Sequence, residues 1–308
     1  MAELPGGGVA MTQTPPARLA VGVVSAGRAG AVLGAALARS GHVVVATSGV
    51  SRDSLRRAEE LLPGVPLLSP DEVVRRADLV LLAVPDDALA GLVRGLVAMD
   101  TLRAGQILVH TSGAFGVDVL QPAAELGVLA LALHPVMTFT GRQEDLDRVA
   151  ACCVGVTAAE GDEAAWSVGE ALVVEMGAEP VRVPEASRPL YHAALAHGSN
   201  HLITLVAECA DLLRRAGIEP AERLLGPLLS AALDNGLRHG DRALTGPVAR
   251  GDAGTVRKHL EVLGRAAPEV LPAYLALARR TAQRAEAAGV LRADLTAEIN
   301  AALNEESA

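Results

Sequence analysis

An apolar run that leads through a glycine-containing loop into an alanine-rich segment constrains this chain more than any other feature. The run is Val21-Gly22-Val23-Val24, the loop is Ser25-Ala26-Gly27-Arg28-Ala29-Gly30, and the segment after it has helical composition through Ala38. Gly27 allows the backbone to approach a pyrophosphate, Gly30 lets the helix pack close to the strand, and the helix N-terminus offers unpaired N–H groups. The pattern predicts a Rossmann-type dinucleotide-binding unit, with Ser25 in place of the usual first glycine.

Short apolar runs alternate with Ala/Leu-rich stretches from Arg18 to about Pro184. The predicted strands are Leu19–Val24, His42–Ala46, Asp78–Val84, Gln106–His110, Val128–Leu133, Cys152–Val156 and Glu179–Val183. Continuous apolarity is typical of strands that are buried on both faces. The sequence therefore predicts an α/β fold, a mostly parallel Rossmann-type sheet with helices on both faces. Ser69-Pro70, with Glu72 three residues after the serine, predicts a helix start.

The β pattern stops after Pro184, and an all-helical C-terminal domain is expected. Helices are predicted near 186–216, 219–239, 252–265, 268–288 and 291–304. We therefore expect a disordered tail at 1–17, an NADP-binding Rossmann domain at 18–184 and a helical substrate and dimerisation domain at 185–308. One helical stripe needs an apolar partner in the same chain or in a second subunit, which makes a homodimer the expected assembly. The stripe consists of Leu195, Leu202, Leu205, Cys209 and Leu212.

Composition excludes two classes of partner. The formal net charge is −9, no dense Lys/Arg cluster is present, and the aromatic residues are one Trp, two Tyr and two Phe, which argues against nucleic acid. No apolar run approaches the roughly 18 residues that span a bilayer. The first 17 residues lack the basic start and apolar run of a signal peptide, so a cytoplasmic location is expected. The three cysteines fit neither a disulfide framework nor a metal site and are predicted to be buried thiols.

The residues about 20 positions beyond Gly27 bear on the choice of cofactor. An acid there would accept the ribose hydroxyls of NAD, but the chain has Thr47-Ser48-Gly49-Val50-Ser51-Arg52. Hydroxyls followed by an arginine suit a 2′-phosphate, because a guanidinium pairs with phosphate oxygens. We predict NADP (NADPH), bound by Ser25, Ala26, Gly27, Arg28, Ala29, Gly30, Thr47, Ser48, Ser51 and Arg52. The alternative is that Arg52 is a solvated turn residue and Asp53 serves as the acid.

Three strand exits carry further candidate residues, since ligands lie at the carboxyl ends of parallel strands. They are Val84-Pro85-Asp86-Asp87, His110-Thr111-Ser112-Gly113-Ala114 and His134-Pro135-Val136-Met137. The predicted cofactor contacts at these exits are Val84, Pro85, Asp86, Thr111 and Ser112. The alternative is ordinary strand-exit and helix-capping chemistry.

A polar cluster lies between Tyr191 and His201, in the first predicted helix of the C-terminal domain. His192, Ser199 and Asn200 share one helical sector, and an imidazole there suits donation of a proton to a substrate carbonyl. His197 and His201 form a separate i,i+4 pair, but no third ligand at metal-site spacing follows, so no metal is predicted. The alternative for the cluster is a polar seam between domains.

A turn at 244–252 contains Thr245, which precedes Gly246-Pro247, and Arg250, which precedes Gly251-Asp252. Asp252 is the predicted N-cap of the next helix. Thr245 and Arg250 are candidate substrate contacts, with Arg250 either holding a substrate carboxylate or pairing with Asp252. An architectural role for the turn is the alternative.

Together these motifs resemble the Rossmann-like oxidoreductases that carry the C-terminal domain of unknown function 2520, relatives of the pyrroline-carboxylate reductase, prephenate dehydrogenase and β-hydroxyacid dehydrogenase group. The residues that carry the resemblance are Gly27–Gly30, Ala83–Asp86, His110–Gly113, His134-Pro135, Tyr191–Ala194, Ser199-Asn200, Thr245–Pro247 and Arg250–Asp252. The resemblance implies NADP-linked reduction, with nicotinamide near Ser112 and His134 and substrate beside His192 and Asn200. Some similar proteins have been linked to reduction of 2-dehydropantoate, a 2-keto acid. The candidate catalytic residues are His192, Asn200, Ser199, Ser112 and His134.

Two positions depart from the family pattern. Ser25 stands where the family usually has glycine, and Arg188 stands where a lysine is expected. An arginine anchors a substrate carboxylate but hardly transfers a proton, so if Arg188 faces the substrate the acid role moves to His192. The competing function, from another class, is an NADP(H)-binding sensor or scaffold without catalysis. A reduced deazaflavin as hydride carrier is a third possibility, against which Arg52 argues.

Overall fold

The computed structural model describes residues 18–305, so the predicted tail at 1–17 lies outside the described residues. Contacts divide the chain into two compact units, one ending at Ala196 and the other beginning at His197. The division falls inside the long helix α8 (Arg188–Arg215). The boundary at 184/185 expected from the sequence stays a prediction.

The first unit contains a seven-stranded sheet in the order β2-β1-β3-β4-β5-β6-β7. Its strands are β1 (Ala20–Val24), β2 (Val43–Thr47), β3 (Leu79–Leu82), β4 (Ile107–His110), β5 (Leu129–Pro135), β6 (Cys153–Thr157) and β7 (Glu179–Arg182). All seven predicted strands are confirmed. Five neighbouring pairs run parallel, and only β5 and β6 are antiparallel. The prediction of a mostly parallel α/β sheet is therefore correct.

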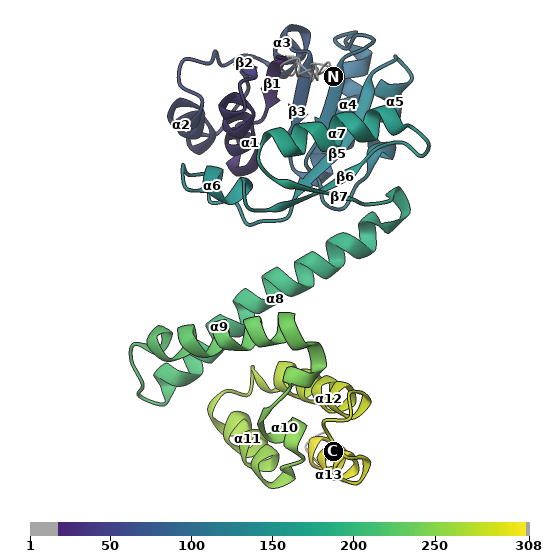
Figure 1. The fold of residues 1–308 in the computed structure, drawn as a ribbon. Coiled ribbons are helices and arrows are strands. Elements are labelled where there is room, and N and C mark those ends of the chain that lie inside the picture. The colour runs from purple at the N-terminus through teal and green to yellow at the C-terminus, as the bar shows by residue number, and fades with distance from the viewer. Residues whose placement is uncertain (1–17, 306–308) are drawn as a thin grey trace, which may run out of the picture. The chain divides into compact units, whose positions relative to one another are not determined.

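Helices cover both faces of this sheet (Figure 1). On one face lie α1 (Arg28–Arg39), α2 (Arg52–Leu61), α6 (Asp145–Val149) and α7 (Glu163–Glu175), and on the other α3 (Pro70–Arg76), α4 (Asp86–Ala98), η1 (Val117–Leu120) and α5 (Gln121–Ala124). In β3, Leu79 and Leu81 belong to the hydrophobic cluster on the face covered by α1 and α7. Val80 and Leu82 belong to the cluster on the face covered by α3 and α4. Successive side chains of a strand point to opposite faces, which explains the continuous apolar runs.

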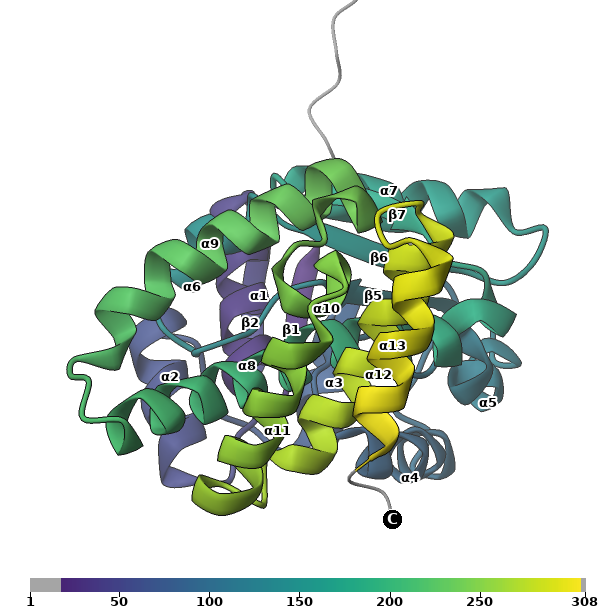
Figure 2. The ribbon, with the colours of Figure 1, turned by 90° about the horizontal axis from the view of Figure 1, so that it is seen from below.

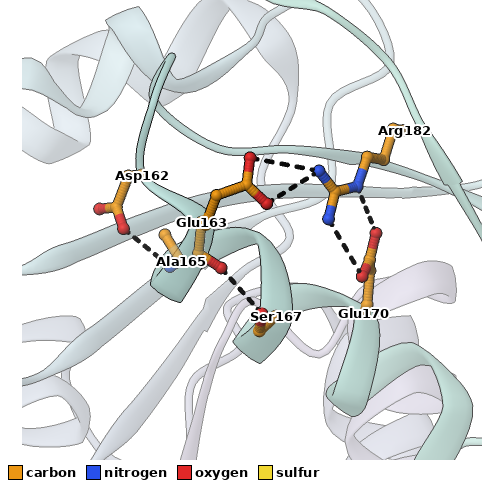
Figure 3. Close-up of polar contacts among 6 residues, drawn as sticks. All are labelled: Asp162, Glu163, Ala165, Ser167, Glu170 and Arg182. Carbon is orange, nitrogen blue, oxygen red and sulfur yellow. Dashed lines mark hydrogen bonds and ion pairs between the residues drawn. The ribbon is translucent and has the colours of Figure 1, made fainter.

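Local polar contacts fix several helix ends. The carboxylate of Glu72 accepts a hydrogen bond from the Ser69 backbone N–H at 3.1 Å, which confirms the predicted start of α3. Figure 3 shows α7 tied to the edge strand β7, because Arg182 of β7 pairs with Glu170 at 2.6 Å and with Glu163 at 3.2 Å. The ion pairs are solvent-exposed and contribute little stability individually.

The second unit is helical, as predicted. Its helices are the end of α8 together with α9 (Ala221–His239), α10 (Gly246–Arg250), α11 (Ala253–Ala266), α12 (Leu271–Ala287) and α13 (Ala293–Asn304). Short 3₁₀ turns, η2 (Glu185–Ser187) and η3 (Gly240–Ala243), precede α8 and follow α9. Helix α13 packs on α11 and α12, and α10 contacts the same two helices (Figure 2). Asp252 accepts a hydrogen bond from Thr255 N at 3.0 Å, so the predicted N-cap of α11 is confirmed.

The α8 stripe and the cysteines are only partly buried within the described residues. Cys209 packs with α9, so part of the predicted α8 stripe finds its partner in the same chain, while Leu202 stays 42% exposed. The prediction that all three cysteines are buried is wrong for Cys153, the first residue of β6, which is exposed, while Cys152 and Cys209 are partly buried. No helix among residues 18–305 is long and apolar enough to cross a membrane.

Candidate functional site

The strand order reverses direction between β1 and β3. Strand β2 lies on one side of β1 and β3 on the other, so the segments leaving β1 and β3 separate at the carboxyl edge of the sheet. Such a reversal opens a crevice where ligands of open α/β sheets bind. The loop after β1 and the segment Val84-Pro85-Asp86 after β3 both lie at this edge. The sequence-predicted dinucleotide loop is thus at the topological switch point.

The loop after β1 makes a left-handed turn before α1 begins. Ser25 has φ of 78°, a region that glycine occupies without strain and that other residues rarely adopt. Gly27 is the N-cap of α1, and no side chain among residues 18–305 accepts a hydrogen bond from the N–H groups of its first turn. Those N–H groups and the positive end of the helix dipole form a site for an anion. Arg28, the first residue of α1, adds an exposed guanidinium.

Gly30 is fixed by the packing of α1 on this loop. A Cβ at Gly30 would lie 2.1 Å from the Ser25 carbonyl oxygen, so the close approach predicted from the sequence is present. A Cβ at Gly27 would meet only Ser25 Oγ, at 3.5 Å, and the Ala83 oxygen, at 4.0 Å. Gly27 is therefore not demanded by the protein's own packing, which leaves room above it for a ligand.

The hydroxyl groups at and just after the end of β2 make hydrogen bonds to neighbouring backbone groups. Ser48 Oγ accepts a hydrogen bond from Ser25 N at 2.9 Å, and Ser48 O accepts one from Ala26 N at 2.7 Å. Thr47 Oγ1 donates to Val23 O at 3.1 Å, and Ser51 Oγ caps α2 by accepting from Ser54 N. These placements favour a role in shaping the loop for Thr47, Ser48 and Ser51, rather than the direct cofactor contacts predicted from sequence.

Arginines gather beside the loop without acids to neutralise them. A Cβ at Gly141 would lie 2.8 Å from Arg57 Cδ and 3.0 Å from Arg28 Cγ, so both side chains approach the same glycine. Within residues 18–305, no carboxylate pairs with Arg28, Arg52 or Arg57. Asp53 instead pairs with Arg56 at 3.3 Å, which weakens its candidacy as the ribose-binding acid. Arg57 carries no local sequence signal. Its proximity to Arg28 arises only because the loop after β5 brings Gly141 beside both side chains.

Strand β4 ends in a buried, neutral histidine. His110 Nε2 donates to the Gly116 carbonyl at 2.7 Å, and Nδ1 accepts from Ser112 N at 3.2 Å, so the two bonds together define the tautomer. Burial lowers the pKa of His110 to about 4, although its bond to Gly116 opposes the shift. Ser112 Oγ accepts from Ala114 N and Phe115 N, both at 3.2 Å, which fixes the loop after the strand. Thr111 N continues the pairing with β3 by bonding Leu82 O at 3.3 Å.

Arg188 lies beneath this loop and is 1% exposed. Its Nε donates to Thr157 Oγ1 at 2.8 Å, Nη1 to Ser112 O at 3.3 Å, and Nη2 to Ala132 O at 3.1 Å and Gly155 O at 3.0 Å. Burial lowers the pKa of Arg188, yet arginine stays charged at neutral pH. Because all three of its nitrogens donate hydrogen bonds within the protein, Arg188 is placed to hold β4, β5 and β6 to α8, which argues against its predicted role as a substrate anchor.

Two imidazoles meet at Gly113. A Cβ there would lie 2.6 Å from His192 Cδ2 and 2.8 Å from His134 Nε2, and the two rings are edge-to-face with centroids 6.1 Å apart. His134 Nδ1 is 2.8 Å from the Tyr191 hydroxyl. The sequence singled out His134 and His192 separately, and the fold brings them together with Ser112 next to Gly113. An imidazole in this position can hydrogen-bond a substrate oxygen and supply a proton.

Other predicted residues are more dispersed. Pro85 is the N-cap of α4 and Asp86 its exposed first residue, and their contact with the cofactor stays a prediction. Ser199 and Asn200 lie on α8 within the second unit, where Asn200 O accepts from Thr204 Oγ1 at 3.2 Å. His197 Nδ1 and His201 Nδ1 are 2.7 Å apart, but no group of three potential metal ligands occurs among the described residues.

Thr245 and Arg250 bound the short helix α10. Thr245 is its N-cap, and Arg250 is its exposed last residue. The positive charge of Arg250 helps to lower the pKa of Asp252, after the larger effects of the Thr255 hydroxyl and backbone N–H. Their role in binding substrate stays a prediction.

Models of known protein families match both halves of the chain. A family model described as a Rossmann-like domain matches residues 7–135, and one described as a domain of unknown function (DUF2520) matches residues 152–281. Among curated proteins, none matches the chain.

Solved structures match over nearly the full length. One is a "putative NADP oxidoreductase" from Bacteroides fragilis, with 20% identity, a TM-score of 0.71, and coverage of 86% of this chain and 98% of that one. An imine reductase from Pseudomonas sp. has 19% identity, a TM-score of 0.64, and coverage of 92% and 99%. An imine reductase from Streptomyces aurantiacus has 17% identity, a TM-score of 0.63, and coverage of 91% and 99%. At these identities the similarity establishes the fold.

Proposed function

We propose that this chain, which belongs to the proteins that join a Rossmann-like domain to the DUF2520 domain, is a reductase that transfers hydride between NADPH and a carbonyl or imine carbon of a small acid. The observation that carries the proposal is one edge of the sheet, which combines an open helix N-terminus at Gly27 with the two imidazoles at Gly113. The helix N-terminus suits a pyrophosphate, and the imidazoles suit a reacting carbonyl. The names of the structural neighbours, NADP oxidoreductase and imine reductase, support the same class.

The residues present fit a phosphorylated dinucleotide. The first turn of α1 would hold the pyrophosphate, while Arg28, Arg52 and Arg57 would hold the 2′-phosphate, since none has a carboxylate partner among residues 18–305. When bound, NADPH would supply the hydride. The protein's task is to position the substrate beside the cofactor and to manage the proton.

Substituting the unpaired arginines should distinguish the two nicotinamide cofactors. Arg52→Ala and Arg57→Ala are each expected to weaken NADPH binding about tenfold or more, because a charge-assisted hydrogen bond contributes about 1.5–3 kcal/mol. Binding of NADH should hardly change. Arg56→Ala is the matched control on the same helix, because Arg56 is already paired with Asp53 and Glu60. Calorimetric titration measures both affinities, and tighter binding of NADH by the unmodified protein would contradict the proposal.

The catalytic residues proposed are His134 and His192, with Ser112 shaping their loop and Ser199 and Asn200 as predicted hydrogen-bonding partners of the substrate. Arg250 and Thr245 remain the proposed contacts for a substrate carboxylate. NADPH absorbance should fall when the protein receives a suitable member of a panel of 2-keto acids, including 2-dehydropantoate, β-keto acids and cyclic imines. Retained NADPH binding without turnover of any member would favour the non-catalytic sensor.

We also propose a homodimer through the helical unit, in the cytoplasm as the sequence predicts. In α9, Leu228 is 64% and Leu237 80% exposed, and they lie on opposite sides of the helix. Large apolar side chains exposed on one helix mark an interaction surface, and a second copy would supply the cover.

Introducing a charge into α9 should therefore disrupt the dimer. Leu228→Glu is expected to convert dimer to monomer in sedimentation equilibrium, because a buried unpaired carboxylate costs several kcal/mol. Val262→Glu, at a half-exposed position on α11, should leave the mass unchanged. A monomeric unmodified protein would refute the proposed assembly.

A further inference from the structure

The contact between His134 and Tyr191 has no part in the roles assigned so far. Tyr191 lies in the first turns of α8 and His134 near the end of β5, and the tyrosine hydroxyl is 2.8 Å from Nδ1. Glycine at position 155 leaves room for that hydroxyl, because a Cβ there would lie 2.6 Å from it. The guanidinium carbon of Arg188 lies 5.6 Å from the centre of the tyrosine ring.

This contact determines which nitrogen of His134 carries hydrogen. Burial raises the pKa of Tyr191, while Arg188 opposes the shift, so the phenol keeps its proton at neutral pH and can donate it in a hydrogen bond. An Nδ1 that accepts this bond has no hydrogen of its own. A neutral His134 then carries its hydrogen on Nε2, which faces the backbone of Gly113 and has no hydrogen-bond partner within residues 18–305.

The charges around His134 favour one kind of substrate. Arg188 and His192 on α8, His110 on β4 and Asp86 on α4 all act on it, and burial followed by the Arg188 charge lowers the pKa of His134 to about 4. The ring is therefore neutral near pH 7. A buried cation and an N–H donor stabilise negative charge on an alkoxide oxygen. A protonated imine would bring a second positive charge near the Arg188 cation. Its N–H donor would also face the N–H of His134 Nε2, which cannot accept a hydrogen bond.

We propose that Tyr191 is a positioning residue that holds His134 as the neutral Nε2–H tautomer, and that this N–H binds the carbonyl oxygen of a ketone or keto acid in preference to an imine. The inference rests on the proposed reductase function and narrows its substrate class to carbonyl compounds.

The proton balance gives Tyr191 a second task. As hydride from the nicotinamide cofactor adds to the carbonyl carbon, the π pair moves to oxygen, and the oxygen takes the proton from Nε2. A neutral imidazole that loses its only N–H proton would become imidazolate, so Nδ1 takes the phenolic proton of Tyr191 at the same time. The resulting phenolate lies beside the Arg188 cation, takes its proton back from Nδ1 as Nε2 takes one from water, and so restores the starting tautomer.

Nitrogen NMR of the imidazoles tests the positioning role without cofactor or substrate. In protein labelled with ¹⁵N-histidine at pH 7, His134 should show a protonated Nε2 and a bare Nδ1, and the variant His134→Gln assigns its signals among the eight histidines. Tyr191→Phe should shift His134 toward a mixture of tautomers. The chain's other tyrosine provides the control, since Tyr274→Phe should alter His259, whose Nδ1 is 2.9 Å from that hydroxyl, and leave His134 unchanged.

Kinetics test the consequence for catalysis. Tyr191→Phe should lower kcat for a keto acid about 10- to 100-fold with KM nearly constant, a loss within the usual range for acid–base groups. An Nδ1–H tautomer in the unmodified protein, unchanged His134 signals in Tyr191→Phe, or faster turnover of imines than of ketones would overturn the inference. The expected tautomer change without turnover of any substrate would support the positioning role of Tyr191 and refute the reductase function instead.

Discussion

Replacing Arg188 with methionine is expected to lower the free energy of unfolding of the first unit by about 4 kcal/mol. The change removes a cation whose N–H groups bond Thr157 Oγ1 and the carbonyl oxygens of Ser112, Ala132 and Gly155. Each buried acceptor left without a donor costs about 1–3 kcal/mol, although relaxation and entering water recover part of the sum. An apolar side chain of similar length fills the space without satisfying those oxygens.

The single tryptophan, Trp166, lies on α7 of the first unit, so its fluorescence during urea denaturation reports the stability of that unit. Arg188→Lys should fall between methionine and the unmodified protein, because an ammonium keeps the charge but lacks the planar arrangement of five N–H donors. Arg103→Met serves as control, since its ion pair with Asp78 is exposed and should contribute less than about 1 kcal/mol. Equal losses at Arg103 and Arg188 would contradict the structural role of Arg188.

Gly30→Ala is expected to weaken NADPH binding at least about 100-fold, close to 3 kcal/mol on the usual scale of 1.4 kcal/mol per tenfold change. The new Cβ would lie 2.1 Å from the Ser25 carbonyl oxygen, and that oxygen belongs to backbone, so the loop and α1 must move apart. The movement displaces the N–H groups of the first turn of α1 from the phosphate. Calorimetric titration gives the affinity, and thermal unfolding shows how far the strain also reduces stability.

Two further glycines separate loss of fold from loss of binding. Gly27→Ala should fold normally, because its Cβ meets only Ser25 Oγ and the Ala83 oxygen at ordinary distances, yet it should bind NADPH more weakly by filling the space above the loop. Gly95→Ala, in α4 with no atom within 4 Å of the added Cβ, should bind normally and gain about 0.5–1 kcal/mol of stability. NADPH binding by Gly30→Ala equal to that of the unmodified protein would exclude this loop as the cofactor site.

The regular elements follow from local patterns. Runs such as Leu79–Leu82 are apolar at every position, and that alone indicates a strand between two layers of helices. The start of α3 at Ser69 and the N-cap of α11 at Asp252 follow from side chains within three residues of the helix end. The antiparallel pairing of β5 with β6 does not, because continuous apolarity carries no information about strand direction.

The site is less predictable, since its contacts join distant parts of the chain. Sequence assigned Thr47 and Ser48 to the cofactor and Arg188 to the substrate, whereas all three side chains make hydrogen bonds inside the protein. Whether a polar side chain serves a ligand or the fold depends on which groups surround it. Those groups come from other strands, as when Arg188 reaches Ser112.

By itself the sequence determined the secondary structure, the mostly parallel sheet and the position of the glycine-containing loop after β1, because each depends on short-range periodicity, capping and glycine placement. Tertiary structure decided which of the candidate side chains meet. It placed His134 beside Tyr191, 57 residues away, and brought Arg57 near Arg28 at Gly141. Such pairs lie too far apart in sequence for local rules to find them, and the fold brings them together because burying the two apolar faces of the sheet fixes the strand order.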